Sequence, residues 1–304
     1  MHLRKFAWIY IVLLVAIGIS LWMLQRNYIS EPFTIEIPKK IWTYWNSEEI
    51  PPFVVRCVKN WKRQNQEYEV TVIQPKTMET YIPSSVIPVT FKELTPQQQA
   101  DWIRLYLLKE YGGFWLDASI VLTQSLSWIQ KKGVPTYGFY IQGFTKDPQY
   151  PVLENWFIAS VPQAPFIQAW YKEFHFVCTE FGNNGNKYNE YLKNKYGDTV
   201  YQQLLQNIQG PDYLTMHMAA QKIMQIDKVP PYACDIAEEG PYYILVKKAG
   251  WDANRFAEEM SKPYTDTFVP PIIKLRGLER NAMIHYLTTH TPDKDSIYTR
   301  FLQD

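Results

Sequence analysis

The length, composition and charge of the chain allow one sizeable buried core and argue against nucleic-acid binding. The chain has 304 residues with 31 Lys and Arg against 30 Asp and Glu, so its formal net charge is +1 and no basic field favours a nucleic-acid partner. The three cysteines have no CxxC or other zinc-ligand spacing and are too few for a disulfide scaffold.

Residues 6–24, FAWIYIVLLVAIGISLWML, form an uncharged run long enough to cross a hydrocarbon core of about 30 Å as a helix. The Arg-Lys pair before it favours a cytoplasmic N-terminus. We therefore expect a single-pass type II membrane protein with residues 1–5 as cytoplasmic tail, residues 25–36 as stem and residues 37–304 as the globular domain. A cleaved signal peptide is the alternative. Membrane lipid is an expected partner, in a Golgi-type membrane for a eukaryotic chain or the cell membrane for a bacterial one.

The globular domain begins with a predicted strand, helix and strand. Ile37–Trp45 is an apolar run typical of a buried strand, and Pro51–Asn65 predicts a helix opened by proline. The predicted apolar side of this helix consists of Val54, Val55, Val58 and Trp61. Tyr68–Gln74 alternates β-branched residues as a strand does. This order indicates a βαβ unit, and therefore an α/β fold whose Rossmann-like, mostly parallel sheet is flanked by helices.

The next element is a predicted helix that ends at a double glycine. Thr95 is a suitable N-cap, a proline occupies the first helical position, and Gln98 completes a capping box. The helix should run to about Tyr111, because glycine most readily adopts the left-handed conformation after a last turn. Phe114–Leu122 then predicts a buried strand, interrupted by Asp117 where the strand should leave the core.

The rest of the chain predicts further strands and then mostly helices. The predicted strands cover Thr136–Gly143 and Glu154–Ser160, and the predicted helices cover Pro165–Cys178, residues 186–224 with a break at Gly210-Pro211, and residues 251–260. We therefore expect a helical C-terminal annex beside the sheet.

Two acids and a guanidinium are predicted to converge at the end of the interrupted strand. Asp101 and Arg104 are three residues apart on the predicted helix, so they share a face. The double glycine brings the strand back beside that helix, and Asp117 emerges at the strand's carboxyl end, where ligands of open α/β sheets collect. Carboxylates accept hydrogen bonds from sugar hydroxyls or hold a divalent ion against a diphosphate, and arginine binds oxygens bidentately. The alternative is an intrahelical salt bridge and a turn-forming aspartate.

Five segments occur in this order over most of residues 37–215: IPKKIWTYW, CVKNWKRQNQEYEV, QADWIRLYLLKEYGGFWLDASI, ENWFIASVPQAPFIQAWYKEF and GPDYLT. In these segments the chain resembles the capsular polysaccharide synthesis family and the related DXD-motif glycosyltransferases, which include the yeast-type initiating mannosyltransferases. The resemblance implies a GT-A fold, a nucleotide-sugar donor and usually a divalent cation, Mn²⁺ or Mg²⁺.

The resemblance also implies roles for single residues. Trp42 and Trp45 would lie near the nucleotide base, Asp101 and Arg104 would hold the donor sugar, and Asp117 would be the first acid of the DXD element. The spacing of the last three is also similar to that in the glucosylating bacterial toxins.

The chain departs from the family pattern at the second acid of the DXD element. The motif reads Asp117-Ala118-Ser119, so Ser119 would be a neutral ligand that binds the metal directly or through water. His285 would be the late-chain histidine that completes the metal shell, with a core histidine as the alternative.

Three further positions are weaker binding-site predictions. Lys274, in PPIIKLRG, would neutralise donor phosphate, or is a solvated surface lysine. Asn155 would border the acceptor groove with Trp156, which is equally suited to the core. Asp212 lies in a Gly-Pro-Asp segment that resembles a family loop near the donor, or is simply part of a helix break.

The resemblance implies a hexosyltransferase whose catalytic domain is residues 37–304. It would transfer a hexose from a UDP- or GDP-sugar to a glycan with retention, while Arg104 and the cation stabilise the leaving diphosphate. The sequence names no nucleophile or base. The alternatives are a non-catalytic membrane-anchored sugar-binding pseudo-transferase, which lost an acid at Ser119, and a membrane-bound glycoside hydrolase, which needs two positioned carboxylates.

Overall fold

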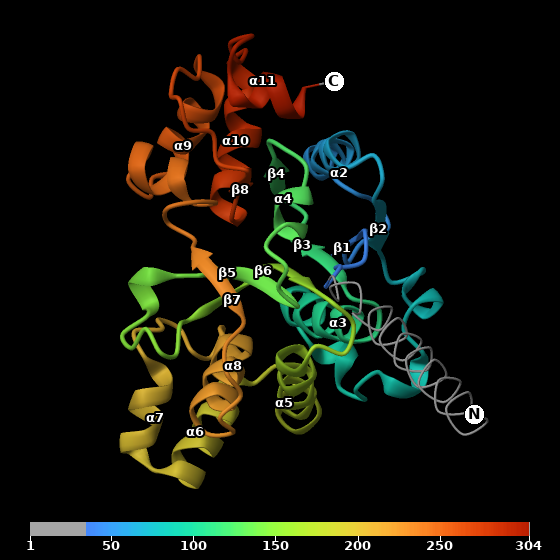
Figure 1. Cartoon of the computed structure of the whole chain (residues 1–304), viewed down its shortest axis with the longest axis vertical. Helices are drawn as coiled ribbons and strands as arrows, with labels where there is room; N and C mark the ends of the chain where they lie inside the picture. The colour runs from blue at the N-terminus through green and yellow to red at the C-terminus, as the bar shows by residue number, and fades with distance from the viewer. Residues whose placement is uncertain (1–34, 304) are drawn as a thin grey trace, which may run out of the picture. The chain divides into compact units, whose positions relative to one another are not determined.

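The computed structural model describes residues 35–303 (Figure 1). The strands and helices discussed below belong to one compact unit that begins at Glu36. Within the described range, no helix has both the length and the apolar character that a membrane span requires. The predicted tail, the anchor at residues 6–24 and most of the stem lie outside the described residues. The anchor, its orientation and a membrane location therefore stay predictions.

A six-stranded sheet, in the order β2-β1-β3-β6-β5-β7, forms the centre of this unit. Its strands are β1 (Lys40–Tyr44), β2 (Glu69–Ile73), β3 (Gly113–Leu116), β5 (Thr136–Tyr140), β6 (Leu153–Ser160) and β7 (Ala233–Ile236). β1 is parallel to both β2 and β3, β6 is antiparallel to β3 and β5, and β7 is parallel to β5. Every strand of this sheet except β6 therefore points the same way, which confirms the predicted α/β class with a mostly parallel sheet.

The first βαβ unit forms as predicted, with α2 (Pro52–Gln64) between β1 and β2. The predicted apolar side of α2 is wrong at one position. Val54 is fully buried, whereas Val55 is 38% exposed, because Val55 lies about 100° further round the helix, beyond the edge of the buried side that Phe53 and Val54 share. Cys57 and Asn60 complete the buried side instead.

The helix α3 (Pro96–Tyr111) has the predicted capping box between Thr95 and Gln98. Gly112 and Gly113 follow with φ angles of 62° and 97°, a region that side chains with a Cβ rarely adopt. A Cβ on Gly113 would also lie 2.6 Å from a backbone oxygen of β1. The double glycine therefore turns the chain directly from α3 into the buried strand β3.

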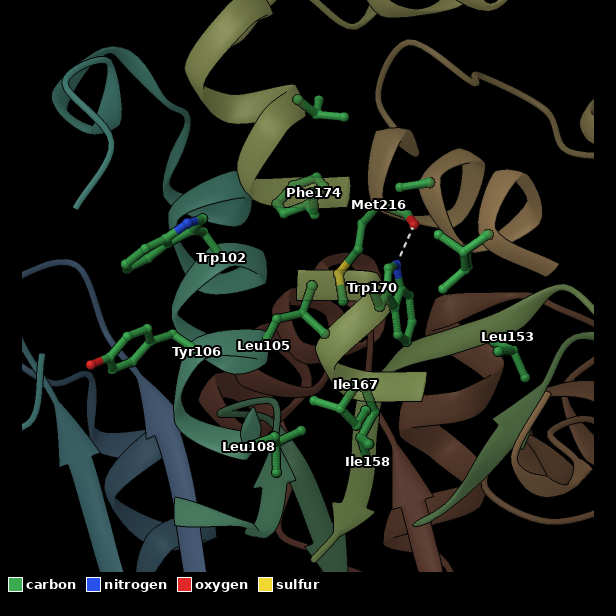
Figure 2. Close-up of a cluster of buried hydrophobic side chains, with 14 of the residues drawn as sticks. Trp102, Leu105, Tyr106, Leu108, Leu153, Ile158, Ile167, Trp170, Phe174 and Met216 are labelled. Atoms are coloured by element: carbon green, nitrogen blue, oxygen red, sulfur yellow. Dashed lines mark hydrogen bonds between the residues drawn. The ribbon is translucent and has the colours of Figure 1, made fainter. Parts of the chain in front are cut away.

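Helices form cores on both faces of the sheet. One core packs α3 against α5 (Pro165–Phe181) and α8 (Thr215–Gln225). Figure 2 shows the side chains of this core, including Trp102 of α3 and Trp170 of α5, whose Nε1 donates a hydrogen bond to the Met216 carbonyl at 2.8 Å. The other core lies beneath α2, α9 (Ala253–Ser261) and α10 (Gly277–Thr289). Both cores therefore contain buried aromatic side chains.

The remaining described elements follow the chain order. They are α4 (Ser127–Gln130), α6 (Gly185–Tyr196), α7 (Asp198–Leu205), α9 (Ala253–Ser261), α10 (Gly277–Thr289), α11 (Ile297–Leu302), short 3-10 turns at Met78–Thr80, Ser84–Val86, Phe91–Glu93 and Gln142–Phe144, and a π-helical turn at Ile244–Lys248. The predicted helix break at Gly210-Pro211 lies between α7 and α8. α7 already ends at Leu205, where the C-cap Gln206 has a φ of 52°.

A small second sheet ties the end of the chain to the centre. After Asp117 the chain turns and forms β4 (Ile120–Leu122), which pairs antiparallel with β8 (Ile272–Lys274). The buried Asn60 of α2 holds β4 in place, since its amide bonds both backbone groups of Leu122 at 2.8 Å. This pairing brings Lys274 next to Asp117, although 157 positions separate them in the sequence.

Candidate functional site

A cavity of about 550 Å³ opens at the carboxyl ends of β1 and β3. Its walls come from α3, β6, the start of α8, and the segment that joins β8 to α10. This is the edge of an open α/β sheet where ligands characteristically bind. Of the predicted site residues, the lining includes Trp45, Asp101, Arg104, Asp117, Ser119, Asn155 and Lys274.

Arg104 joins the two predicted acids at the floor of the cavity. Its guanidinium is 2% exposed and bonds Asp101 through Nη1 and Asp117 Oδ1 through Nη2, the latter at 2.9 Å. The Trp115 ring lies against it, with its centroid 4.8 Å from Cζ. The structure therefore brings together the three side chains that the helix, glycine and strand pattern predicts to converge.

Two more predicted residues extend this network. Lys274 is only 6% exposed, and its Nζ lies 2.7 Å from Asp117 Oδ2. The lysine therefore belongs to the site and is not a solvated surface residue. Asn155 Nδ2 donates to Asp101 Oδ1 at 3.0 Å. Cations and carboxylates thus alternate along one line from Asp101 through Arg104 and Asp117 to Lys274.

The two carboxyl groups of the network differ in protonation behaviour. Burial raises the pKa of Asp101 above its ordinary value, and the nearby Arg104 only partly offsets this. Burial acts in the same direction on Asp117, but the charges of Lys274 and Arg104 outweigh it and lower the pKa of Asp117. Asp117 is therefore held as a carboxylate, ready to accept hydrogen bonds.

The two tryptophans predicted near the base lie in different places. Trp45 lines the cavity beside Arg280, whose guanidinium lies 5.8 Å from its ring centroid. Trp42 does not line it: its side chain is fully buried in the core, where Nε1 donates to the Gly112 carbonyl at 2.9 Å. Residues an odd number of positions apart point to opposite faces of a strand, which separates the pair.

Asp212 and His285 also lie outside the cavity lining. Asp212 is an exposed residue of the turn before α8, and its neighbour Tyr213 lines the cavity instead. His285 is on the exposed side of α10. Neither residue joins the network around Arg104.

The residues around Asp117 do not fit a resident divalent cation. Both oxygens of Asp117 already bind cations or N–H groups, from Arg104, Trp115 and Lys274. Ser119 Oγ donates its hydrogen to the Leu275 carbonyl at 2.8 Å. Across residues 35–303 there is no group of three or more His, Cys, Asp or Glu side chains that could hold a metal ion. Mn²⁺ or Mg²⁺ stays a prediction from the family resemblance, which the contacts of Asp117 and Ser119 do not support.

The sequence pattern does not predict Glu154 and His217, two of the ionisable residues that line the cavity. Glu154 of β6 is 7% exposed and His217 of α8 is 5% exposed, and both line the cavity. Each residue is an ionisable group in a largely buried element, Glu154 in the strand LENWFIAS and His217 in α8. An ionisable residue at such a position conflicts with the local pattern and could have indicated a site. Their proximity depends on how α8 packs against β6, which the sequence pattern does not specify.

The chain matches the family model described as capsular polysaccharide synthesis protein over residues 23–276. It is 29% identical over 175 residues to O-glycosyltransferase braB of Annulohypoxylon truncatum, covering 51% of this chain and 40% of that protein. It is 32% identical over 102 residues to O-glycosyltransferase PaGT of Phomopsis amygdali, covering 29% of this chain and 25% of that protein. It is 24% identical over 247 residues to glycosyltransferase afumC of Aspergillus fumigatus, covering 75% of this chain and 60% of that protein.

Two solved structures resemble the fold at low similarity. PaToxG glycosyltransferase has a TM-score of 0.38 and 13% identity over 97% of this chain and 95% of its own. An active-site mutant of LgtC has a TM-score of 0.39 and 10% identity over 84% of this chain and 98% of its own. The family match covers most of the sequence, and the chain belongs to the capsular polysaccharide synthesis protein family.

Proposed function

We propose that this protein transfers a hexose from a UDP- or GDP-sugar to a hydroxyl group of a glycan, with retention, in a GT-A-like fold. The observation that carries the proposal is the buried network of Asp101, Arg104 and Asp117 at the floor of a cavity of about 550 Å³. The curated relatives named as glycosyltransferases support it, although the chain spans 25% to 60% of their lengths.

We assign the two ends of the network to different parts of the donor. The carboxylates of Asp101 and Asp117 accept hydrogen bonds, so they suit the hydroxyls of the transferred sugar. Lys274, at the other end, carries the positive charge that suits the diphosphate. Trp45 offers a flat ring for the base. Arg104 fixes both carboxylates and stabilises the charge that develops on the leaving group.

A divalent cation, where one binds, would supply additional positive charge to the leaving diphosphate. The side chains of the cavity do not need it for the roles assigned here. Arg104 and Lys274 both contact Asp117 directly, and they orient the donor through hydrogen bonds.

A screen of UDP- and GDP-sugars tests the proposal at the level of binding and turnover. A ligand that binds only the native state raises the melting temperature, so at least one sugar nucleotide should stabilise the protein and release its nucleotide during incubation. Stabilisation without any release would favour the sugar-binding pseudo-transferase. Release of free sugar from a glycan without a nucleotide donor would favour the glycoside hydrolase. Neither stabilisation nor release by any sugar nucleotide would contradict the proposal.

A further inference from the structure

The carboxylate of Glu154 is a buried group without a hydrogen-bond donor. It is 7% exposed and lines the cavity, yet no hydrogen bond to it is found among residues 35–303. Nε2 of His217 lies 3.9 Å from Oε2 of Glu154. This distance is too long for a hydrogen bond. Buried carboxylates are normally bonded, and exceptions mark places where a ligand or water completes the site.

His217 contains a buried nitrogen, Nδ1, without a hydrogen-bond partner in the described part of the chain, whereas the oxygens of Glu154 are open to the cavity. Arg276, which also lines the cavity, is bonded twice to the fully buried Glu279, at 2.9 Å and 2.6 Å. Arg276 therefore does not complete the shell of Glu154, and the missing partner of this carboxylate is a donor such as a hydroxyl group.

The pair lies directly beside the donor network. Glu154 precedes Asn155, which donates to Asp101, and His217 follows Met216, whose Sδ lies 3.3 Å from Arg104 Nη1. Glu154 and His217 line the same cavity as Asp101 and Arg104. A hydroxyl bound to Glu154 would lie next to a sugar held by that pair.

We propose that Glu154 binds the acceptor hydroxyl and acts as its base, and that His217 positions the carboxylate. The inference rests on the proposed function. In the step, the acceptor oxygen forms a bond to the anomeric carbon on the same face from which the phosphate leaves, so the configuration is retained. The bond from that carbon to the phosphate oxygen breaks, and its electron pair leaves with the nucleoside diphosphate. The hydroxyl proton passes to a carboxylate oxygen of Glu154.

The experiment measures nucleotide release with water as acceptor, from the sugar nucleotide that stabilises wild type most. Glu154→Gln keeps the size of the side chain and removes the base, so turnover at saturating donor should fall by about 100-fold. The donor-induced rise in melting temperature should persist. Formate, a small carboxylate, should restore part of the turnover of Glu154→Ala. His217→Asn should lower kcat without raising the KM for the donor.

Glu173 provides the matched control. It is a buried carboxylate of α5 that bonds Tyr188 and Lys222 and does not line the cavity. Glu173→Gln should leave kcat unchanged even where it lowers the melting temperature. Unchanged turnover in Glu154→Gln, or loss of activity in Glu154→Ala that formate does not restore, would overturn the role of Glu154 while leaving donor binding intact. If no sugar nucleotide binds wild type, the proposed function fails first and this inference fails with it.

Discussion

Arg104 is the residue on which the site depends most. Its guanidinium is 2% exposed and lies between two carboxylates, while its Nε has no hydrogen-bond partner in the described residues. A buried charge of this kind is tolerated because its neighbours compensate it, and removing one member leaves the others uncompensated. Stability and donor recognition are therefore coupled at this position.

Replacing Arg104 should destabilise the fold strongly. Arg104→Met leaves Asp101 and Asp117 without the cation between them, and the expected cost is about 3–5 kcal/mol in the free energy of unfolding. Arg300→Met is the control, because Arg300 is exposed and its distance to Asp295 is 3.8 Å, and such exposed pairs contribute only about 0–1 kcal/mol. Urea unfolding of both variants measures the difference. Equal losses would contradict the buried network.

Asp117 should make the stability depend on pH. The pKa of Asp117 is lowered in the folded state, so its contribution is complete above the ordinary aspartate pKa of about 3.9 and is lost as the pH falls through the folded value. Asp117→Asn should therefore be less stable than wild type at about pH 6, and the difference should shrink towards about pH 3.5. Urea unfolding across this range measures it. A difference that stays constant with pH would contradict the ionised carboxylate.

At the scale of elements, the turn between α3 and β3 sets the geometry of the site. The capping box fixes the start of α3, and the double glycine fixes its end, so Asp101 and Arg104 reach Asp117 without an intervening loop. This part could be predicted from the sequence, because helix caps, glycine turns and the spacing of side chains on one helix face are local properties. Strand alternation is also a local property, and it places Trp42 and Trp45 on opposite faces, so the sequence already argues against both tryptophans facing the base.

Gly113→Ala should disturb this turn. The φ angle of Gly113 is 97° and an added Cβ would lie 2.6 Å from the Lys40 carbonyl oxygen, so the expected cost is at least about 1–3 kcal/mol. Gly133→Ala is the control that separates backbone strain from steric collision. Gly133 also has a positive φ, 63°, but no atom lies within 4 Å of the added Cβ. Thermal unfolding should show the larger loss for Gly113→Ala. Equal losses would show that the close approach of β1 does not matter.

At the scale of the whole molecule, the cavity is assembled from segments that are distant in the chain. Lys274 reaches Asp117 through the pairing of β4 with β8, and Glu154 meets His217 through the packing of α8 against β6. Neither pairing follows from local periodicity. The sequence therefore could not show that Lys274 contacts Asp117 or that Glu154 lies near His217. The sheet class follows from the βαβ pattern, whereas the reversed direction of β6 depends on long-range pairing.

Removal of divalent cations should have little effect on donor binding. Lys274 lies 2.7 Å from Asp117 Oδ2, and Ser119 donates its hydroxyl hydrogen to a backbone carbonyl, so the side chains that would bind a cation are already bonded. Calorimetry should give one Kd of the stabilising sugar nucleotide in EDTA and another in Mn²⁺. The two values should differ by less than about tenfold, which corresponds to about 1.4 kcal/mol in binding free energy. Binding that requires Mn²⁺ would show that Lys274 moves away and a metal takes its place.

The central claim is that Asp117 holds the donor sugar in the cavity. Nucleotide release from the stabilising sugar nucleotide should fall by about 100-fold in Asp117→Asn, as expected when the donor is no longer held in register. Asp235→Asn is the matched control. Asp235 is a residue of β7 that accepts hydrogen bonds from Tyr137 and Lys132, and it does not line the cavity. Its turnover should equal that of wild type. Undiminished release by Asp117→Asn would contradict the site.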